Sequence, residues 1–481
     1  MLPNPLSPST TLPTFLSSLR SHLTSPRLLI PLSFLLLGLI NNILYVVILS
    51  AALDLVGPSV PKALVLLFDV APSFFVKLVA PYFIHRVGYG ARVVLCVALA
   101  MAGMGLIALS PLSVSLPGPG GEVGKAGVWA AGKERVEGWL GREKPLPVAP
   151  GGAEVATKLF GIALASVSSG VGELSFLALT SFYGQASLAG WASGTGAAGL
   201  VGAGAYVTAT TTWGFSVRSS LIGFAFLPLG MLGAYFGMLP KRSKGREEGY
   251  APVRGSDESS GSGETEVDDE DAERREDAGL LARAEDGVEV KAEQKEGLAS
   301  NLRRARSLVF PYMLPLFLVY MAEYTINQGV TPTLLYPLDQ TPFKHYRDFY
   351  PTYGALYQLG VFISRSSLPF IRIQSLYIPS LLQWGNLILL ILQALYFTII
   401  PNVWIVFLII FWEGLLGGIV YISTFRRIGE EVPPAEREFS LAATTVSDAA
   451  GISLASLLGM VVETSLCKWQ VGRGRDWCRR L

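Results

Sequence analysis

The sequence predicts an all-α membrane protein that crosses the bilayer about eleven times. Its 481 residues are 51% hydrophobic and 16% charged, and their mean hydropathy is +0.44. Charges this sparse cannot cover the surface of soluble domains of this size. About eleven stretches of roughly 20 apolar residues follow one another along the chain, and each is long enough to cross the hydrocarbon layer as a helix. We therefore expect lipid to be the solvent around most of the chain.

The predicted spans form two groups separated by a polar linker. Six lie near residues 28–51, 62–84, 92–116, 158–182, 188–211 and 218–239, and five near 309–335, 352–371, 375–400, 402–424 and 439–463. We expect a six-helix bundle over 28–240 and a five-helix bundle over 309–463. The linker, 241–308, is dense in charge and poor in apolar residues, which predicts an acidic disordered segment in the cytosol. The smaller parts expected are a disordered leader at 1–27, a non-cytosolic insertion at 117–157 and a basic tail at 464–481.

Basic residues beside the spans predict the orientation of the chain. HRVGYGAR at 85–92, KRSKGR at 241–246 and FRR at 425–427 border even-numbered spans. A cytosolic amino terminus therefore places all of them in the cytosol, as the positive-inside rule requires. The tail after the eleventh span is equally basic, although the number of spans would put it outside. The side that the tail faces stays open.

The three cysteines predict neither a metal site nor a disulfide framework. Cys96, Cys467 and Cys478 have no metal-ligand spacing. Cys478 stands fourth from the end, where a prenylated cysteine would be. Arg479 and Arg480 are not the aliphatic pair that this signal requires, so lipidation of Cys478 stays open.

Parts of the two halves resemble each other. TGAAG at 195–199 in the fifth span matches SDAAG at 447–451 in the eleventh, and each follows a span with a carboxylate, Glu173 or Glu413. A basic residue followed four positions later by proline recurs in spans 2 and 8. These matches occur in the same order in both halves. They favour a duplicated six-helix unit in one orientation, with the twelfth span lost or shortened, as in the parallel repeats of many secondary transporters.

The stretch VYMAEYTINQGV at 319–330 places polar side chains on an apolar helix. Glu323, Asn327 and Gln328 are spaced so that they share one helical face. A charged side chain near the bilayer centre costs about 2.5–3.5 kcal/mol on insertion scales. We therefore expect this face to meet other polar groups or a water-filled path. Asp69 in the second span is expected near a membrane interface.

Polar side chains that interrupt the other spans complete the candidate site. They are Asn41, Asn42, Lys77, Glu173, Arg365 and Glu413. In one interpretation they line a central cavity with Glu323, where carboxylates exchange protons and Lys77 or Arg365 binds an anionic part of a solute. In the other they are interhelical ion pairs, Glu323 with Arg365 or Glu173 with Lys77. The second interpretation is favoured for Asp448.

A glycine-rich stretch predicts helix packing and not nucleotide binding. GTGAAG at 194–199 matches the GxGxxG pattern, but neither a preceding β-strand nor the acidic residue that binds ribose is present. Small residues recur every four positions, at Gly190, Gly194, Ala198 and Gly202, which predicts a ridge for close helix packing. No nucleophile–base pattern, metal site, cofactor site or nucleic-acid-binding segment is predicted. The chain is therefore not expected to be an enzyme.

Several of these stretches resemble the battenin family of lysosomal and vacuolar membrane proteins. They are NNILYVVILSAALD at 41–54, SSGVGELSFLALTSFY at 168–183, VYMAEYTINQG at 319–329, LYQLGVFISRSSL at 356–368, EGLLGG at 413–418 and EREFSLAATTVSDAAGISLASLLG at 436–459. The leader and the linker differ from the animal pattern, so the chain is similar to a fungal member. The resemblance implies a major-facilitator-like fold, a vacuolar or lysosomal location and a role in vacuolar pH homeostasis. It also implies transport of basic amino acids such as arginine, or clearance of glycerophosphodiesters, and a functional need for Glu323 and Arg365.

The leading hypothesis is a vacuolar transporter that works by alternating access about a site between spans 1, 4, 7 and 10. Its expected partners are the lipid bilayer, a small polar solute and protons. The alternative is a non-transporting membrane scaffold or trafficking regulator that changes vacuolar pH indirectly. In the linker, EDAGLL at 276–281 has the form of an acidic-dileucine sorting signal. Glu276, Leu280 and Leu281 are the residues that a sorting adaptor would bind.

Overall fold

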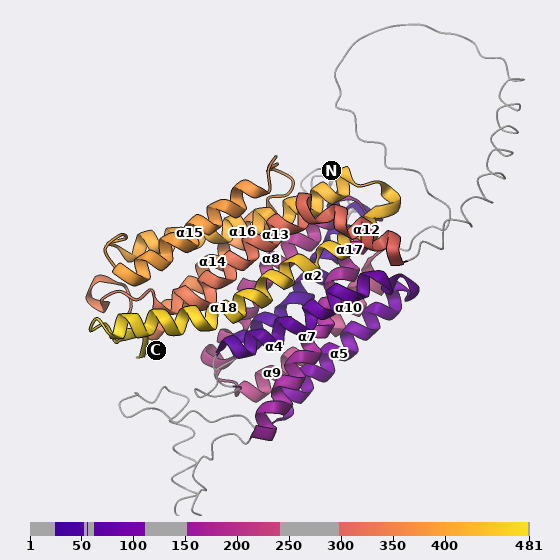
Figure 1. Ribbon diagram of the computed structural model, residues 1–481. Coiled ribbons are helices and arrows are strands. Elements are labelled where there is room, and N and C mark those ends of the chain that lie inside the picture. Colours follow the sequence, from indigo (N-terminus) through magenta and orange to yellow (C-terminus); the bar gives the residue numbers. More distant parts are fainter. Residues whose placement is uncertain (1–24, 52–54, 56–61, 111–151, 241–297, 480–481) are drawn as a thin grey trace, which may run out of the picture. The chain divides into compact units, whose positions relative to one another are not determined.

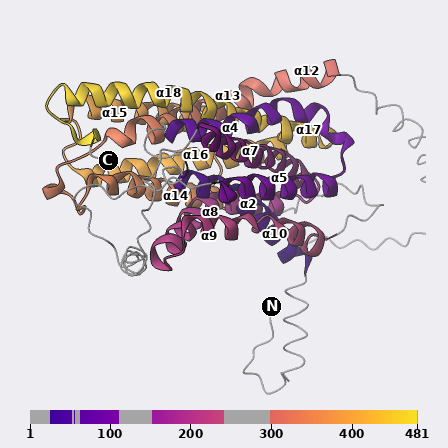
Figure 2. The ribbon, with the colours of Figure 1, turned by 90° about the horizontal axis from the view of Figure 1, so that it is seen from below.

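In the residues that the computed structural model describes, all regular secondary structure is helical (Figure 1, Figure 2). The structure describes residues 25–51, 55, 62–110, 152–240 and 298–479. Nine helices in these ranges are long and apolar enough to cross a membrane. The predicted class, an all-helical membrane protein with several spans, is confirmed. The sorting signal predicted at Glu276, Leu280 and Leu281, and most of the leader, insertion and linker, lie outside the described residues.

The helices follow the chain in two series. The first is α2 (Pro26–Ser50), α4 (Lys62–Val79), α5 (Tyr89–Leu109), α7 (Gly152–Thr180), α8 (Gln185–Val207), α9 (Val217–Ala225) and α10 (Leu229–Leu232). The second is α12 (Leu298–Leu308), α13 (Leu314–Thr325), α14 (Phe349–Ser366), α15 (Tyr377–Tyr396), α16 (Val403–Glu431), α17 (Pro434–Thr444) and α18 (Val446–Val471). π-Helical turns extend some of them, at Thr208–Thr212, Gly233–Met238, Val309–Met313 and Ile326–Val330.

Two of the predicted spans form helices that are not among the nine. The spans predicted at 188–211 and 352–371 correspond to α8 and α14. Both helices lie among other helices, because α8 contacts α2 and α14, and α14 also contacts α16. A helix that packs on protein rather than on lipid does not need a continuous apolar surface. The low hydropathy of α8 and α14 agrees with this packing.

The first and second series of helices share one apolar core. α4 packs on α18 and α8 packs on α14, and further contacts join α16 to α8 and α17 to α7. Phe34 and Trp191 from the first series belong to the same buried cluster as Leu316 and Tyr421 from the second. Each of these four side chains is at most 1% exposed. The helices on both sides of the linker therefore pack as one unit.

Glycines let α2 and α8 approach each other closely. A methyl group added at Gly190 or Gly194 would overlap the main-chain carbonyl group of Pro31 or Leu35 in α2. A methyl group added at Gly202 would press on side chains of α2. Gly190, Gly194 and Gly202 thus face α2, and at Gly190 and Gly194 only a hydrogen atom fits between the two backbones.

The carboxyl-terminal tail is folded back onto α18 by a disulfide, so the expectation that the cysteines form none was wrong. Cys467 and Cys478 are bonded, with their Cα atoms 5.9 Å apart. Gly474, at a φ of 82°, provides the left-handed turn between them, and Trp477 stacks on Tyr346 with a centroid distance of 5.6 Å. The turn that brings the two cysteines together has no recognisable spacing pattern in the sequence. While it is in the disulfide, Cys478 has no thiol to carry a lipid.

We expect Gly194→Ala to destabilise the protein, because the added methyl group would overlap the carbonyl oxygen of Leu35. Overpacking of this kind costs about 1–3 kcal/mol. Gly204→Ala on the same helix is the matched control, since a methyl group there meets nothing within 4 Å and alanine favours a helix. Thermal unfolding in lipid nanodiscs should show a lower midpoint only for Gly194→Ala. Equal midpoints for the two variants would contradict the close contact of α2 and α8.

Candidate functional site

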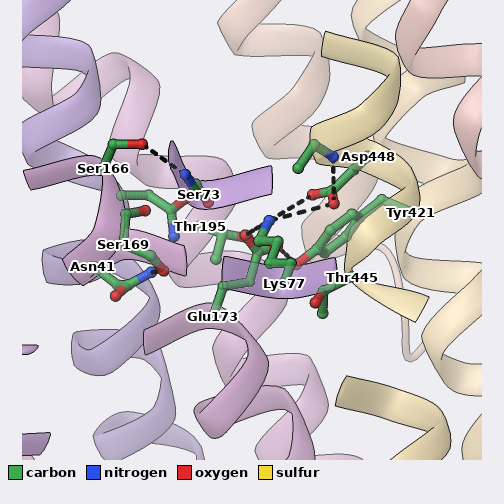
Figure 3. Close-up of polar contacts among 12 residues, drawn as sticks. Asn41, Ser73, Lys77, Ser166, Ser169, Glu173, Thr195, Tyr421, Thr445 and Asp448 are labelled. Atoms are coloured by element: carbon green, nitrogen blue, oxygen red, sulfur yellow. Dashed lines mark hydrogen bonds and ion pairs between the residues drawn. The ribbon is translucent and has the colours of Figure 1, made fainter. Parts of the chain in front are cut away.

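A lysine and two carboxylates meet between the two series of helices (Figure 3). Lys77 lies in the last turn of α4, and its Nζ is 2.6 Å from Oε2 of Glu173 in α7 and 3.3 Å from Oδ1 of Asp448 in α18. All three residues are at most 7% exposed. We call these three residues the lysine cluster. Because α18 follows the linker while α4 and α7 precede it, the lysine cluster ties the two halves of the chain together.

Neighbouring groups hold the carboxylates of the lysine cluster in place. Tyr421 in α16 donates a hydrogen bond of 3.0 Å to Oε1 of Glu173 and accepts one of 3.1 Å from Nε1 of Trp191. Asp448 lies in the first turn of α18, where the backbone N–H of Ala449 donates to its Oδ1 at 2.7 Å. The start of a helix favours a negative charge. These bonds offset part of the cost of removing the charges from water.

Arg365 near the end of α14 forms a second polar cluster beside the first. Its two terminal nitrogens donate hydrogen bonds of 2.9 Å to Oγ1 of Thr195 in α8 and 2.6 Å to the hydroxyl of Tyr320 in α13. Its guanidinium carbon lies 4.1 Å from the ring centroid of Tyr421. A planar guanidinium can bond at its edge and stack on a ring at the same time. We call these four residues the arginine cluster, and Tyr421 links it to Glu173 of the lysine cluster.

Two further carboxyl groups are buried without a cation in direct contact. Glu323 in α13 is 1% exposed, and its Oε1 accepts a hydrogen bond from Tyr357 in α14. Glu413 in α16 is 0% exposed, and its Oε1 accepts a bond of 3.1 Å from Nδ2 of Asn327. The Oε2 atom of each group has no hydrogen-bond partner. We call Glu323 and Glu413 the unpaired carboxyls. A buried polar atom without a partner calls for an explanation, such as a functional role or a bound water molecule.

The two asparagines of α2 lie apart from these clusters. Asn41 is 5% exposed, and its Nδ2 donates a hydrogen bond of 3.1 Å to the main-chain carbonyl of Ser169 in α7 (Figure 3). Asn42 donates to the carbonyl of Gly38 in its own helix at 3.0 Å. The structure therefore gives Asn41 a contact between helices and Asn42 a local one.

The polar stretch that follows Glu323 is not a regular α-helix. α13 ends at Thr325, and a π-helical turn covers Ile326–Val330. The expectation of a shared face based on α-helical spacing therefore does not hold in detail. Asn327 bonds to α16, whereas Gln328 accepts a bond of 3.4 Å from the hydroxyl of Tyr350, beside the start of α14. π-Helical turns occur often at functional sites because they redirect side chains.

One of the two ion pairs considered from the sequence is formed. Glu173 pairs with Lys77, and Asp448 joins this pair. Glu323 and Arg365 bond to tyrosines instead of to each other. None of these tyrosines is predicted from the sequence to be part of the site, although Tyr320 stands three residues before Glu323 and so faces the same side of α13. That spacing was the signal for its part in the site.

The site offers groups that can bind a cation and a group that can bind an anion. The unpaired Oε2 atoms of Glu323 and Glu413 can hold protons or accept from a cationic amine or guanidinium. Nε of Arg365 also has no partner, and a guanidinium N–H donates well to a carboxylate or phosphate. In the ranges that the structure describes, no group of three or more His, Cys, Asp or Glu side chains is arranged to hold a metal ion.

Comparison with known proteins identifies the family of the chain. The family model described as CLN3 protein matches residues 32–120 and 146–469. Protein btn1 of Aspergillus fumigatus is 52% identical, Protein BTN1 of Chaetomium globosum 51% and Protein btn-1 of Neurospora crassa 49%, each over 100% of this chain and 97% of its own length. These matches agree with the resemblance to battenin. The chain is a multi-pass membrane protein that belongs to the CLN3, or battenin, family.

Proposed function

We propose that the chain is a vacuolar membrane transporter of a small polar solute that works by alternating access and contributes to vacuolar pH homeostasis. The observation that carries this proposal is the set of buried polar atoms without partners on Glu323, Glu413 and Arg365. Ionisable groups in the hydrocarbon layer are costly and mark the path of a solute or ion by default. For the same reason, we propose that the chain is a transporter and not an enzyme.

The helix pairs between the two halves support a major-facilitator-like arrangement of six and five spans. α4, α8, α14 and α18 correspond to the predicted spans 2, 5, 8 and 11. Equivalent spans of the two halves are six places apart, so α4 is equivalent to α14 and α18 to α8. The contact of α4 with α18 therefore has a counterpart in the contact of α14 with α8. Each of these helix pairs also has a basic side chain that bonds across it: Lys77 bonds to Asp448 in the first pair, and Arg365 bonds to Thr195 in the second. Two like halves can rock about a site between them.

In this mechanism the lysine cluster is the contact that closes one side. Lys77 is held to Glu173 of its own half at 2.6 Å and to Asp448 of the other half at 3.3 Å. Movement of α18 away from α4 would break the longer contact and leave the shorter one intact. Lys77 would therefore keep a counter-ion in both states, which limits the cost of opening.

Two solute classes fit the donors and acceptors of the site. A basic amino acid such as arginine would place its cationic group at the unpaired carboxyls. A glycerophosphodiester would place its phosphate at Arg365, where a guanidinium recognises it well. Protons carried by the unpaired carboxyls during transport would connect either activity to vacuolar pH.

The second candidate function is a non-transporting scaffold or trafficking regulator that affects vacuolar pH indirectly. The lysine cluster favours it, because all three of its side chains are buried in closed contacts. Such contacts need no solute to satisfy them. The unpaired atoms of Glu323 and Glu413 are the features that this candidate leaves without a role.

The disulfide supports a lumenal tail. α13 begins beside the linker and leads to Thr333, and Gln470 at the end of α18 donates a hydrogen bond of 3.1 Å to the carbonyl of Thr333. The tail therefore lies at the end of α13 that is remote from the linker. Disulfides form and persist in the oxidising lumen of the secretory pathway. With the linker in the cytosol, we propose that the tail and the Cys467–Cys478 bond face the vacuolar lumen.

Transport by purified protein in liposomes tests the proposed function. We expect uptake of either arginine or a glycerophosphodiester. If arginine is the solute, Glu323→Gln should lower its uptake about tenfold or more, since loss of a charged contact costs roughly 1.5–3 kcal/mol. If the glycerophosphodiester is the solute, Arg365→Ala should have the larger effect. Asp339→Asn is the control, because Asp339 lies exposed in the loop between α13 and α14.

Three outcomes of that assay are informative. Arginine uptake that is unchanged in Glu323→Gln would count against a cation bound by this carboxyl group. Equal losses in Glu323→Gln and Asp339→Asn would point to general damage and not to a solute site. Purified protein that neither moves nor binds either solute would contradict the transporter and favour the scaffold.

A protease-protection experiment tests the lumenal tail. A peptide tag added after Leu481 should resist protease in sealed microsomes and become sensitive when detergent opens the membrane. A tag before Met1 is the control and should be digested without detergent. Digestion of the carboxyl-terminal tag in sealed vesicles would place the tail in the cytosol and overturn this topology.

A further inference from the structure

A small cavity in the first half of the chain contains a carboxyl group without a partner. Its polar lining is Asp69 of α4, Asn41 and Tyr45 of α2, and Ser168 and Ser169 of α7. Asp69 is 4% exposed, and its Oδ2 has no hydrogen-bond partner. The cavity encloses about 10 Å³, which is room for one water molecule. We propose that Asp69 is a proton-binding site, which holds its proton in this structure and exchanges it through a single water molecule in the cavity.

The surroundings of Asp69 cannot stabilise a negative charge. An ionised carboxyl group that is buried without a counter-ion or hydrogen bonds is strongly destabilised. The cation on the same helix, Lys77, is already bound to Glu173 and Asp448. The neutral acid therefore fits this site better than the carboxylate. A neutral acid still needs a polar neighbour, which the cavity lining supplies.

Several charged groups on the helices that pack on α4 have contacts of their own, and none of these contacts is with Asp69. Tyr45 of α2 lines the cavity with Asp69. Lys158 of α7 donates to the carbonyl of Leu55 at 2.6 Å. Glu173 and Asp448 bind Lys77. In α17, Arg437 bonds to Val432 and Glu438 bonds to Tyr89. In the described part of the chain these contacts leave Asp69 without a cation beside it.

The cavity is poorly suited to a metal cation. Hard metal ions require six or more oxygen ligands around them. The polar atoms of the lining that lack partners are Oδ2 of Asp69 and Oδ1 of Asn41. Ser168 uses its hydroxyl to donate to the carbonyl of Cys96 at 2.7 Å. The rest of the lining is apolar: Ile40, Leu44, Ala100, Ala165, Pro228 and Met231. A proton needs one oxygen only.

Tyr45 connects this cavity to the second half of the chain. Its hydroxyl donates to the hydroxyl of Tyr324 in α13 at 3.5 Å. Tyr324 is the residue next to Glu323, and its ring stacks on Tyr320 of the arginine cluster with a centroid distance of 6.1 Å. The proton site at Asp69 is therefore one tyrosine away from the helix that carries the candidate solute site.

Infrared spectroscopy of the full-length protein in lipid nanodiscs tests the proposal. A neutral carboxylic acid has a carbonyl band that is separate from the bands of carboxylates. At neutral pH we expect such a band in the unchanged protein and its partial loss in Asp69→Asn. Asp339→Asn is the matched control, since Asp339 is exposed in the loop between α13 and α14. In the unchanged protein, aspartate labelled with carbon-13 should shift the band, which keeps the test valid if Asp69→Asn fails to fold.

Two results would overturn the proposal. An acid band that is identical in the unchanged protein and Asp69→Asn, or that does not move with labelled aspartate, would show that Asp69 carries no proton. Loss of the band on addition of sodium chloride, but not of choline chloride, would show a metal-cation site. Because the readout does not involve transport, either result leaves the proposed transporter standing, and a failure of transport leaves the proton site standing.

Discussion

The contact between Lys77 and its two carboxylates is the interaction on which the arrangement of the halves depends. A lysine in the hydrocarbon layer is tolerated only with a counter-ion, and Lys77 takes one from its own half and one from the other. Loss of Lys77 would leave two buried carboxylates without a cation, and breaking a buried pair in this way costs about 3–5 kcal/mol. The lysine cluster therefore joins α4 to α18, and in the proposed mechanism this contact is reversible because Asp448 can leave while Glu173 stays bound to Lys77.

The arginine cluster has a different character. Arg365 is satisfied by neutral hydroxyl groups and by the ring of Tyr421, and not by a carboxylate. Its charge is therefore not neutralised locally, while Glu323 and Glu413 lie buried nearby with free oxygens. An anionic solute would compensate the charge of Arg365, and a cationic solute would bind Glu323 and Glu413. Tyr421 contacts both Arg365 and Glu173 and so links the two clusters.

Much of the fold can be predicted from the sequence because hydropathy and charge are local properties. The membrane class follows from composition, and the positions of the helices follow from runs of apolar residues. Glu173 and Lys77 were recognised as costly in the bilayer, and their pairing was one of the interpretations. The choice between partners is not local: Lys77 also reaches Asp448, whereas Glu323 and Arg365 bond to tyrosines.

Some features depend on irregular backbone that spacing rules do not describe. The π-helical turn at Ile326–Val330 redirects Asn327 toward Glu413, and the glycine turn in the tail brings Cys467 to Cys478. The expectation that Asp69 lies near a membrane interface stays a prediction, and nothing in the sequence indicates that its side chain is only 4% exposed. Burial of this kind is decided by the helices around a residue and not by its own segment.

The most direct test of the central claim is a double-mutant cycle across the two halves. The free energy of unfolding in lipid nanodiscs would be measured for Lys77→Met, Asp448→Asn and their combination, with Lys77→Met plus Asp339→Asn as the distant control pair. We expect a coupling energy of about 0.5–3 kcal/mol for Lys77 with Asp448 and additivity for the control. Additivity for Lys77 with Asp448 would contradict the claim that this ion pair joins the halves.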